Sequence, residues 1–146
     1  MPSYQMFVNK GQLTAEQKAK AAVAITDAHC AKTGAPRWYV QVIINEVEEG
    51  NRFICGFPAK DIVWLRGDVR IRTHEQNKEL MDAIAAGVGE ACGMPSGNVW
   101  IDLSGIDSLN VLKFDTTFPA AGGEKKWFET LSESTLEQIR KLESGS

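Results

Sequence analysis

The sequence contains the same pattern twice, at a spacing of 59 residues. Thr14 begins the quartet Thr-Ala-Glu-Gln, and Thr73 begins Thr-His-Glu-Gln. The stretches 14–36 and 73–95 share seven identical residues, including the Gly-x-Pro with which each one ends. Self-similarity at a fixed spacing is typical of a repeated supersecondary unit. The repeat therefore constrains the fold more than any other feature of the chain.

Each copy is predicted to hold one helix flanked by strands. Thr followed three residues later by Gln is a capping box that begins a helix, and Gly-x-Pro is a typical helix end. The second helix carries apolar residues at helical spacing, namely Leu80, Met81, Ile84, Ala85, Val88 and Cys92. β-branched and aromatic residues predict strands over 3–8, 38–44, 62–65 and 98–102, and a short hairpin arm over 52–56.

These elements predict an α+β fold made of two β-α-β units. Because β-α-β crossovers are right-handed, both helices are expected on one face of a four-stranded sheet. A length of 146 residues fits a single domain, with repeat halves 2–45 and 61–103 and a C-terminal extension over 104–146. In the extension we predict a loop over 119–123 and a helix over 134–142, and the pair Trp127-Phe128 needs a surface to cover it.

The predicted sheet has helices on one face only, which leaves its other face uncovered. Trp38, Trp64 and Trp100 each fall in a different predicted strand and raise the apolar content of the sheet. Exposed apolar faces are commonly buried by assembly. We therefore expect the chain to form an oligomer.

Composition argues against several classes of function. The net charge is -3 without a dense basic run, so nucleic-acid binding is not expected. Three cysteines without CxxC spacing predict neither a metal site nor a disulfide framework. No signal sequence is recognisable, and no apolar run approaches the roughly 18 residues of a membrane span. These features predict a cytoplasmic protein that does not bind membranes.

The two copies differ at their first position, where Pro2 corresponds to Asp61. A small second residue allows removal of Met1, and a processed chain would begin with the secondary amine of proline. Such an amine, with an ordinary pKa near 8, becomes a neutral base at working pH when burial and cations lower that value. The alternative is that Pro2 is simply tolerated at the start of a strand.

The copies also differ at His29, which corresponds to the apolar Val88 and is therefore predicted to face inward. A lone inward histidine is more often a core residue than a functional one. Arg70 and Arg72 precede the second helix alone. Two guanidinium groups two residues apart on extended chain point the same way and suit one carboxylate. The alternative for the arginines is a solvated loop.

Taken together, these residues resemble the tautomerase superfamily, and within it the cis-3-chloroacrylic acid dehalogenase family. The resemblance covers nearly the whole chain. It includes Pro2-Ser-Tyr4, Ala24-Ile-Thr-Asp-Ala-His29, Gln41-Val-Ile43, Asn45-Glu-Val47, Arg72-Thr73, Val99-Trp-Ile101 and Trp127-Phe-Glu-Thr-Leu131. It implies a β-α-β repeat fold, a homotrimer, and an N-terminal proline that acts as catalytic base or acid.

By position, the resemblance assigns that role to Pro2 and the substrate-binding histidine and first arginine to His29 and Arg70. Arg72 matches the second arginine only if one residue between them is deleted. The family dehalogenases carry a tyrosine in the closing strand and a glutamate in a Glu-Tyr-Gly-Arg segment, which together activate water.

This chain has Asp102 near the position of that tyrosine, and Lys113 in place of the glutamate. A protonated lysine cannot accept a proton, so hydrolytic dehalogenation is not expected. Both residues stay candidates for substrate binding.

The leading hypothesis is a keto-enol tautomerase, an isomerase, that acts on a small 2-oxo or enol carboxylate. Arg70 and Arg72 would hold the carboxylate, His29 would bond a carbonyl or carboxylate oxygen, and the nitrogen of Pro2 would move a proton. This chemistry needs neither metal nor cofactor.

Two alternatives stay open at the level of the sequence. One is a hydratase, a decarboxylase or a weak dehalogenase of an unsaturated acid, in which Pro2 donates a proton and Asp102 orients water. The other is a non-catalytic trimeric binding module, because a fold does not dictate a function.

Overall fold

The computed structural model describes residues 2–146. Its long strands are β1 (Ser3–Asn9), β2 (Gln41–Val47), β5 (Val63–Arg70) and β6 (Val99–Ile106). Its α-helices are α1 (Ala15–Thr33), α2 (His74–Cys92), α3 (Glu124–Glu129) and α4 (Glu133–Ser144). Two hairpins pair β3 (Phe53–Ile54) with β4 (Phe57–Pro58) and β7 (Leu112–Lys113) with β8 (Thr116–Thr117). Three short 3₁₀ turns are η1 (Arg37–Tyr39), η2 (Ser96–Asn98) and η3 (Ser108–Asn110).

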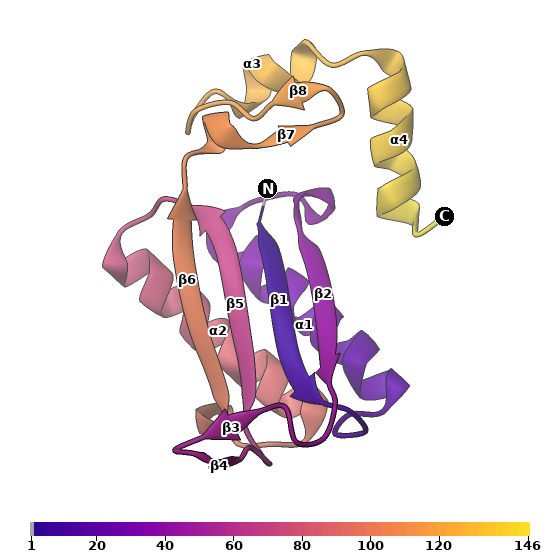
Figure 1. Ribbon diagram of the computed structural model, residues 1–146. Coiled ribbons are helices and arrows are strands. Elements are labelled where there is room, and N and C mark those ends of the chain that lie inside the picture. Colours follow the sequence, from indigo (N-terminus) through magenta and orange to yellow (C-terminus); the bar gives the residue numbers. More distant parts are fainter. Residues whose placement is uncertain (1) are drawn as a thin grey trace.

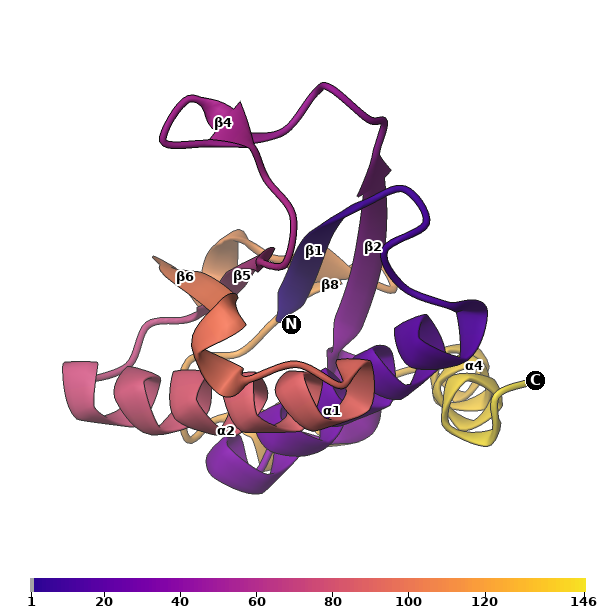
Figure 2. The ribbon, with the colours of Figure 1, turned by 90° about the horizontal axis from the view of Figure 1, so that it is seen from below.

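The four long strands form one mixed sheet in the order β2-β1-β5-β6. The outer pairs β1–β2 and β5–β6 are parallel, and the central pair β1–β5 is antiparallel. Each parallel pair is joined through one helix, so the sheet consists of two β-α-β units side by side. Helices α1 and α2 cover one face of this sheet (Figures 1 and 2). The predicted α+β fold is therefore confirmed.

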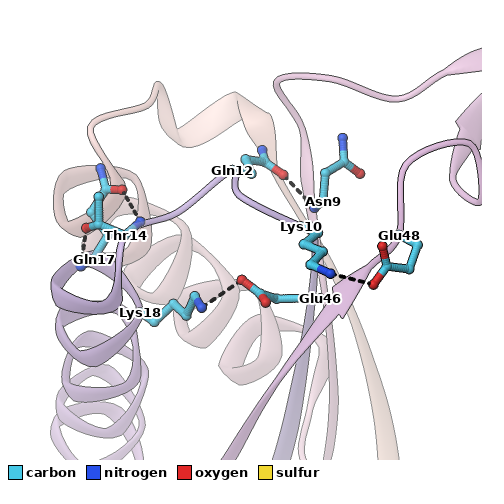
Figure 3. Close-up of polar contacts among 8 residues, drawn as sticks. All are labelled: Asn9, Lys10, Gln12, Thr14, Gln17, Lys18, Glu46 and Glu48. Carbon is cyan, nitrogen blue, oxygen red and sulfur yellow. Dashed lines mark hydrogen bonds and ion pairs between the residues drawn. The ribbon is translucent and has the colours of Figure 1, made fainter.

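The ends of α1 and α2 form as the sequence pattern predicts. The hydroxyl of Thr14 accepts from the backbone N–H of Gln17, whose side chain accepts from the N–H of Thr14 (Figure 3). The same box is present at the start of α2. Gly34 and Gly93 end the two helices in the left-handed conformation, with φ of 72° and 68°. Such a φ favours glycine, which has no Cβ to clash.

The core lies between the helices and the inner face of the sheet. Alternate residues of β1 and β5 are buried, as strand geometry requires. The buried side chains of this core are Tyr4, Met6, Val8, Leu13, Ala21, Ile25, Val63, Leu65, Val69, Leu80, Ile84, Val88, Cys92 and Val99. This core fixes both helices relative to the strand ends, where the chain brings its distinctive residues.

The predicted bounds of three strands were wrong, and one of the three is β6, which runs to Ile106 rather than ending at position 102. The stretch around Trp38 and Tyr39 forms the 3₁₀ turn η1 rather than the start of a strand, and β2 begins at Gln41. The turn follows directly from Pro36, whose fixed φ holds the chain after the end of α1. Conversely, β5 runs on to Arg70, which was expected to follow the strand.

The C-terminal extension carries more structure than predicted. It forms the β7–β8 hairpin and α3 before the expected terminal helix, which as α4 spans Glu133–Ser144. Phe118 is fully buried, and Trp127 stacks on Trp38 with ring centroids 6.2 Å apart. These contacts attach the extension to η1, at the end of the sheet where β1 begins (Figure 1).

The face of the sheet opposite the helices is partly apolar. Phe7 and Trp64 stack on it with centroids 4.9 Å apart, and Trp100 is 48% exposed. Trp38 does not lie on this face, because its segment is a turn. The β3–β4 hairpin projects on the same side as this open face (Figure 2). Among the described residues, no helix has the length and apolar character needed to cross a membrane.

Candidate active site

A cavity of about 770 Å³ opens at the end of the sheet where β1 begins. Pro2, His29, Arg70 and Arg72 all line it, although they lie up to 70 positions apart in the sequence. The rest of its wall includes Thr33, Gly34, Ala35, Pro36, Trp38, Tyr39, Glu124, Lys125, Phe128, Glu129 and Glu143. The structure thus brings four of the six predicted site residues together.

Pro2 is buried directly before the first residue of β1. Its carbonyl accepts a hydrogen bond of 3.0 Å from the backbone N–H of Gln41, which begins the neighbouring parallel strand. This bond continues the β1–β2 ladder by one residue and fixes the proline against the wall of the cavity. Met1 lies outside the described residues.

His29 occupies the last turns of α1 and is only 1% exposed. Its Nδ1 lies 2.6 Å from the hydroxyl of Tyr4, whereas its Nε2 is buried and has no hydrogen-bond partner among the described residues. Burial and the neighbouring Arg72 lower the pKa of His29 to about 3. The histidine is therefore neutral at ordinary pH, and the prediction that it faces inward is confirmed.

The two arginines reach the cavity from the end of β5 and from the loop that follows. Arg70 forms an ion pair with Glu124, the first residue of α3, with 2.5 Å between Nη1 and Oε1. Nη1 of Arg72 donates to the carbonyl of Arg70 at 3.1 Å. Burial and the charge of Arg70 lower the pKa of Arg72. Both arginines line the cavity, where their positive charges favour a bound anion.

The other two predicted site residues do not line this cavity. Asp102 lies on the open face of the sheet, where its carboxylate accepts from Nε1 of Trp64 at 2.7 Å. The alternation of β6 explains this, because its neighbours Ile101 and Leu103 pack into the core. Lys113 does not reach the cavity. Its Nζ donates instead to the carbonyl of Tyr39, a residue of the cavity lining, at 3.0 Å. Burial lowers the pKa of Lys113.

Sequence analysis missed two residues that the structure adds to the site. Tyr4 shares the buried face of its strand with the core residues Met6 and Val8, so its pattern gave no sign of a polar partner. Glu124 lies in the extension, which has no counterpart in the repeat. Burial raises the pKa of the Tyr4 hydroxyl. The hydrogen bond from Arg70 lowers the pKa of Glu124. Tyr4 therefore stays protonated, and Glu124 stays ionised.

Arg70 and Arg72 can bind an anion in this cavity. Beside it, Nε2 of His29 can offer either an N–H or a lone pair. Among residues 2–146, Glu124 is the only carboxylate that forms an ion pair with an arginine of the cavity. In the same part of the chain, no group of three or more His, Cys, Asp or Glu side chains is arranged to hold a metal ion. The chemical roles of Pro2, His29, Arg70 and Arg72 stay predictions.

Comparison with known proteins identifies the family. Residues 1–93 match the family described as "Putative oxalocrotonate tautomerase enzyme". The solved structure of N1, a member of the cis-3-chloroacrylic acid dehalogenase (cis-CaaD) family, superposes with a TM-score of 0.89. It is 31% identical, and the alignment covers 95% of this chain and 99% of that one.

Two more distant structures share the fold. A fused 4-OT, Q0, described as a symmetric trimer, is 23% identical with a TM-score of 0.72, covering 82% of this chain and 98% of that one. Malonate semialdehyde decarboxylase is 16% identical with a TM-score of 0.67, covering 88% and 98%. No curated protein sequence matches the chain. The family match, the N1 structure and the paired β-α-β units agree, and the chain belongs to the tautomerase superfamily as a cis-CaaD-like member.

Proposed function

We propose that this protein is a keto-enol tautomerase that acts on a small 2-oxo or enol carboxylate. The observation that carries the proposal is the convergence of Pro2, His29, Arg70 and Arg72 on one cavity. These residues come from the start of β1, the end of α1 and the region between β5 and α2. Core packing alone does not require polar groups from three elements to meet in one place.

In the proposed reaction, Arg70 and Arg72 bind the substrate carboxylate. The carboxylate would replace or share the contact that Arg70 makes with Glu124. The C2 oxygen would lie toward His29. The imidazole of His29 is neutral, so it brings no charge of its own into the cavity. The arginines and the histidine together would stabilise the enolate as negative charge develops on oxygen.

Pro2 would move the proton. Once Met1 is removed, its nitrogen is a secondary amine with an ordinary pKa near 8. Burial and the guanidinium groups of Arg70 and Arg72 disfavour its protonated form, so the amine would be neutral at working pH. The amine would take the proton of the enol hydroxyl and return a proton to C3, which converts the enol to the ketone with no net consumption of water.

Hydration and hydrolytic dehalogenation are less well supported. Both reactions consume water and need a group in the cavity that activates or orients it, and Asp102 is the residue that the sequence offered for this role. Its carboxylate is instead bonded to Trp64 on the open face of the sheet. A reaction that moves only a proton makes no such demand.

We also propose that the protein is a homotrimer. The open face of the sheet carries exposed apolar side chains, among them Ile43 and Trp100, and Phe53 and Phe57 are exposed on the β3–β4 hairpin. Apolar groups gathered on one side of a molecule are typical of an assembly surface. Two fused 4-OT relatives of the same fold are described as trimers, which supports three copies rather than two.

The test is ketonisation of phenylenolpyruvate, followed by loss of its ultraviolet absorbance. We expect wild type to exceed the buffer rate, and Pro2→Ala to lower kcat/KM by about 10²-fold or more, the usual contribution of general acid–base catalysis. Pro95→Ala is the control, since Pro95 lies outside the lining of the cavity, directly before the 3₁₀ turn η2. Intact mass establishes whether Met1 is absent. A wild type without activity, or Pro2→Ala equal to wild type, contradicts the proposal.

A further inference from the structure

Tyr4 and His29 form a buried pair that the sequence pattern does not reveal. Tyr4 is fully buried on the inner face of β1, and its hydroxyl oxygen lies 2.6 Å from Nδ1 of His29. The two rings meet edge to face, with centroids 5.7 Å apart and planes at 70°. The ring of Tyr4 fits where β5 carries Gly67, since a Cβ there would lie 2.6 Å from Cε1 of Tyr4. The tyrosine is therefore held in place on several sides.

The direction of the hydrogen bond follows from the chemistry of the two groups. Burial keeps the phenol of Tyr4 protonated by raising its pKa. Its hydrogen needs an acceptor, and the only hydrogen-bond partner of this hydroxyl among residues 2–146 is Nδ1 of His29. If Nδ1 were the donor, the phenol hydrogen would be buried without an acceptor, which is costly. Tyr4 therefore donates and Nδ1 accepts.

An accepting Nδ1 fixes the state of the other ring nitrogen. In a neutral imidazole one nitrogen carries the hydrogen and the other accepts, so Nε2 of His29 must carry it. This Nε2 is buried, has no partner among the described residues, and belongs to a side chain that lines the cavity. Buried donors in folded proteins rarely lack a partner. An acceptor supplied by a ligand in the cavity would satisfy this one.

The positive charge of Arg72 helps to keep the ring of His29 neutral. Arg72 approaches from the loop between β5 and α2, and together with burial it disfavours the imidazolium form. No carboxylate is among the causes that act on this ring. The histidine is therefore poised to donate a hydrogen bond and not to accept or give up a proton.

We infer that Tyr4 is a positioning residue, which holds His29 as a neutral Nε2–H donor aimed at the C2 oxygen of a 2-oxo carboxylate. This inference rests on the proposed function for the identity of the ligand. Its structural half, the tautomer of His29, is independent of any activity. Tyr4 itself does not touch the substrate, and it acts only through the imidazole.

The first test is nitrogen-15 NMR of the histidine rings at neutral pH. We expect Nε2 of His29 to carry the hydrogen and Nδ1 to lack it, with a His74→Asn spectrum used to assign the signals. Addition of phenylpyruvate, the ketone product, should shift the Nε2–H resonance. In Tyr4→Phe, which keeps the ring and removes only the hydroxyl, we expect a mixture of the two tautomers.

The second test is kinetic. With Tyr4→Phe we expect kcat for phenylenolpyruvate to fall on the order of tenfold, as for the loss of one hydrogen bond, while KM stays within about twofold. The matched control is Thr26→Val, which removes a hydroxyl from α1, the helix that carries His29. That hydroxyl donates to the carbonyl of Ala22 at 2.9 Å, away from the cavity. Equal thermal melts of the two variants would show that the loss of rate is not a loss of folding.

The outcomes separate the two proposals. A wild-type His29 that carries its hydrogen on Nδ1, or that is protonated at neutral pH, overturns the inference whatever the activity. A Tyr4→Phe protein with unchanged tautomer and unchanged kcat overturns it as well. If the tautomer is found but phenylenolpyruvate is not converted, the proposed function fails and the assignment of the donor stands. If Tyr4→Phe does not fold, the wild-type spectrum and the phenylpyruvate titration decide the question.

Discussion

At the scale of single residues, one position of the repeat changes the character of the molecule. His29 and Val88 occupy equivalent inward positions on the two helices, and both are buried. Val88 belongs to the apolar core, whereas Nδ1 of His29 meets the Tyr4 hydroxyl and the charge of Arg72 acts on the ring. A polar side chain at this depth reduces stability unless it is neutral and hydrogen-bonded. Both conditions are met at Nδ1, and Nε2 remains available to a ligand.

The lowered pKa of His29 predicts a dependence of stability on pH. The unfolded chain takes up a proton on this histidine near 6.5, but the folded chain does so only near 3. Between these values the unfolded state binds more protons, so the free energy of unfolding falls as pH drops below 6.5 and this loss is complete near 3.

Urea unfolding of wild type, His29→Gln and His74→Gln at about pH 7 and about pH 5 measures this effect. We expect the pH dependence to be weaker in His29→Gln and unchanged in His74→Gln. An undiminished slope in His29→Gln would show that this histidine titrates in the folded protein as it does in the unfolded one.

At the scale of elements, β5 is adapted to the site it helps to form. Gly67 pairs with Tyr4 across the antiparallel β1–β5 ladder, and the absence of a side chain there leaves room for the tyrosine ring. Three residues further on, the strand ends at Arg70. One strand thus positions the ring that fixes His29 and supplies an arginine to the same cavity. Glycine inside a strand often marks such a close approach.

Gly67→Ala should therefore be disruptive although alanine is small. The new Cβ would lie 2.6 Å from Tyr4 and 2.8 Å from Leu103, too close for either to stay in place. We expect a loss of about 1–3 kcal/mol in the free energy of unfolding, as for overpacked cores, together with a reduced kcat. Gly97→Ala is the matched control, because nothing lies within 4 Å of its added Cβ. Equal unfolding curves for the two variants would contradict this account of β5.

At the scale of the whole molecule, the extension completes a cavity that the repeat alone leaves open. Helices α3 and α4 contribute Glu124, Phe128 and Glu143 to the wall. The stack of Trp127 on Trp38 attaches these helices to the turn that follows α1. Trp127 thus finds cover in the aromatic cluster of its own chain, whereas Phe128 lines the cavity and stays 46% exposed.

The open face of the sheet gives a prediction about assembly. Trp100 is 48% exposed at the edge of that face, and a charge there would be costly to bury between copies. We expect Trp100→Asp to shift the protein from three copies toward one in size-exclusion chromatography with light scattering. Val23→Asp is the control, because Val23 is 52% exposed on α1, in the opposite layer. A wild-type protein with the mass of one chain would contradict the trimer.

The sequence alone was enough to predict the two helices with their caps, the order of strands and helices within each unit, and the inward position of His29. These features depend on local rules: a capping box, a left-handed glycine, and the spacing of apolar residues. The predictions failed at Trp38 and missed the β7–β8 hairpin and α3 of the extension, although its terminal helix was predicted. There the conformation depends on aromatic contacts between segments far apart in the chain, which no local pattern records.

The candidate site divides in the same way. The broken symmetry of the repeat identified Pro2, His29, Arg70 and Arg72, because each lacks a counterpart in the other copy. Only the tertiary structure added Tyr4 and Glu124 and placed Asp102 on the far face of the sheet. The physical reason is that sequence periodicity reports which residues face the core, whereas hydrogen bonds and ion pairs depend on which side chains meet across separate elements. The sequence therefore determined the repeat and where its symmetry breaks, and the fold decided which polar groups share the cavity.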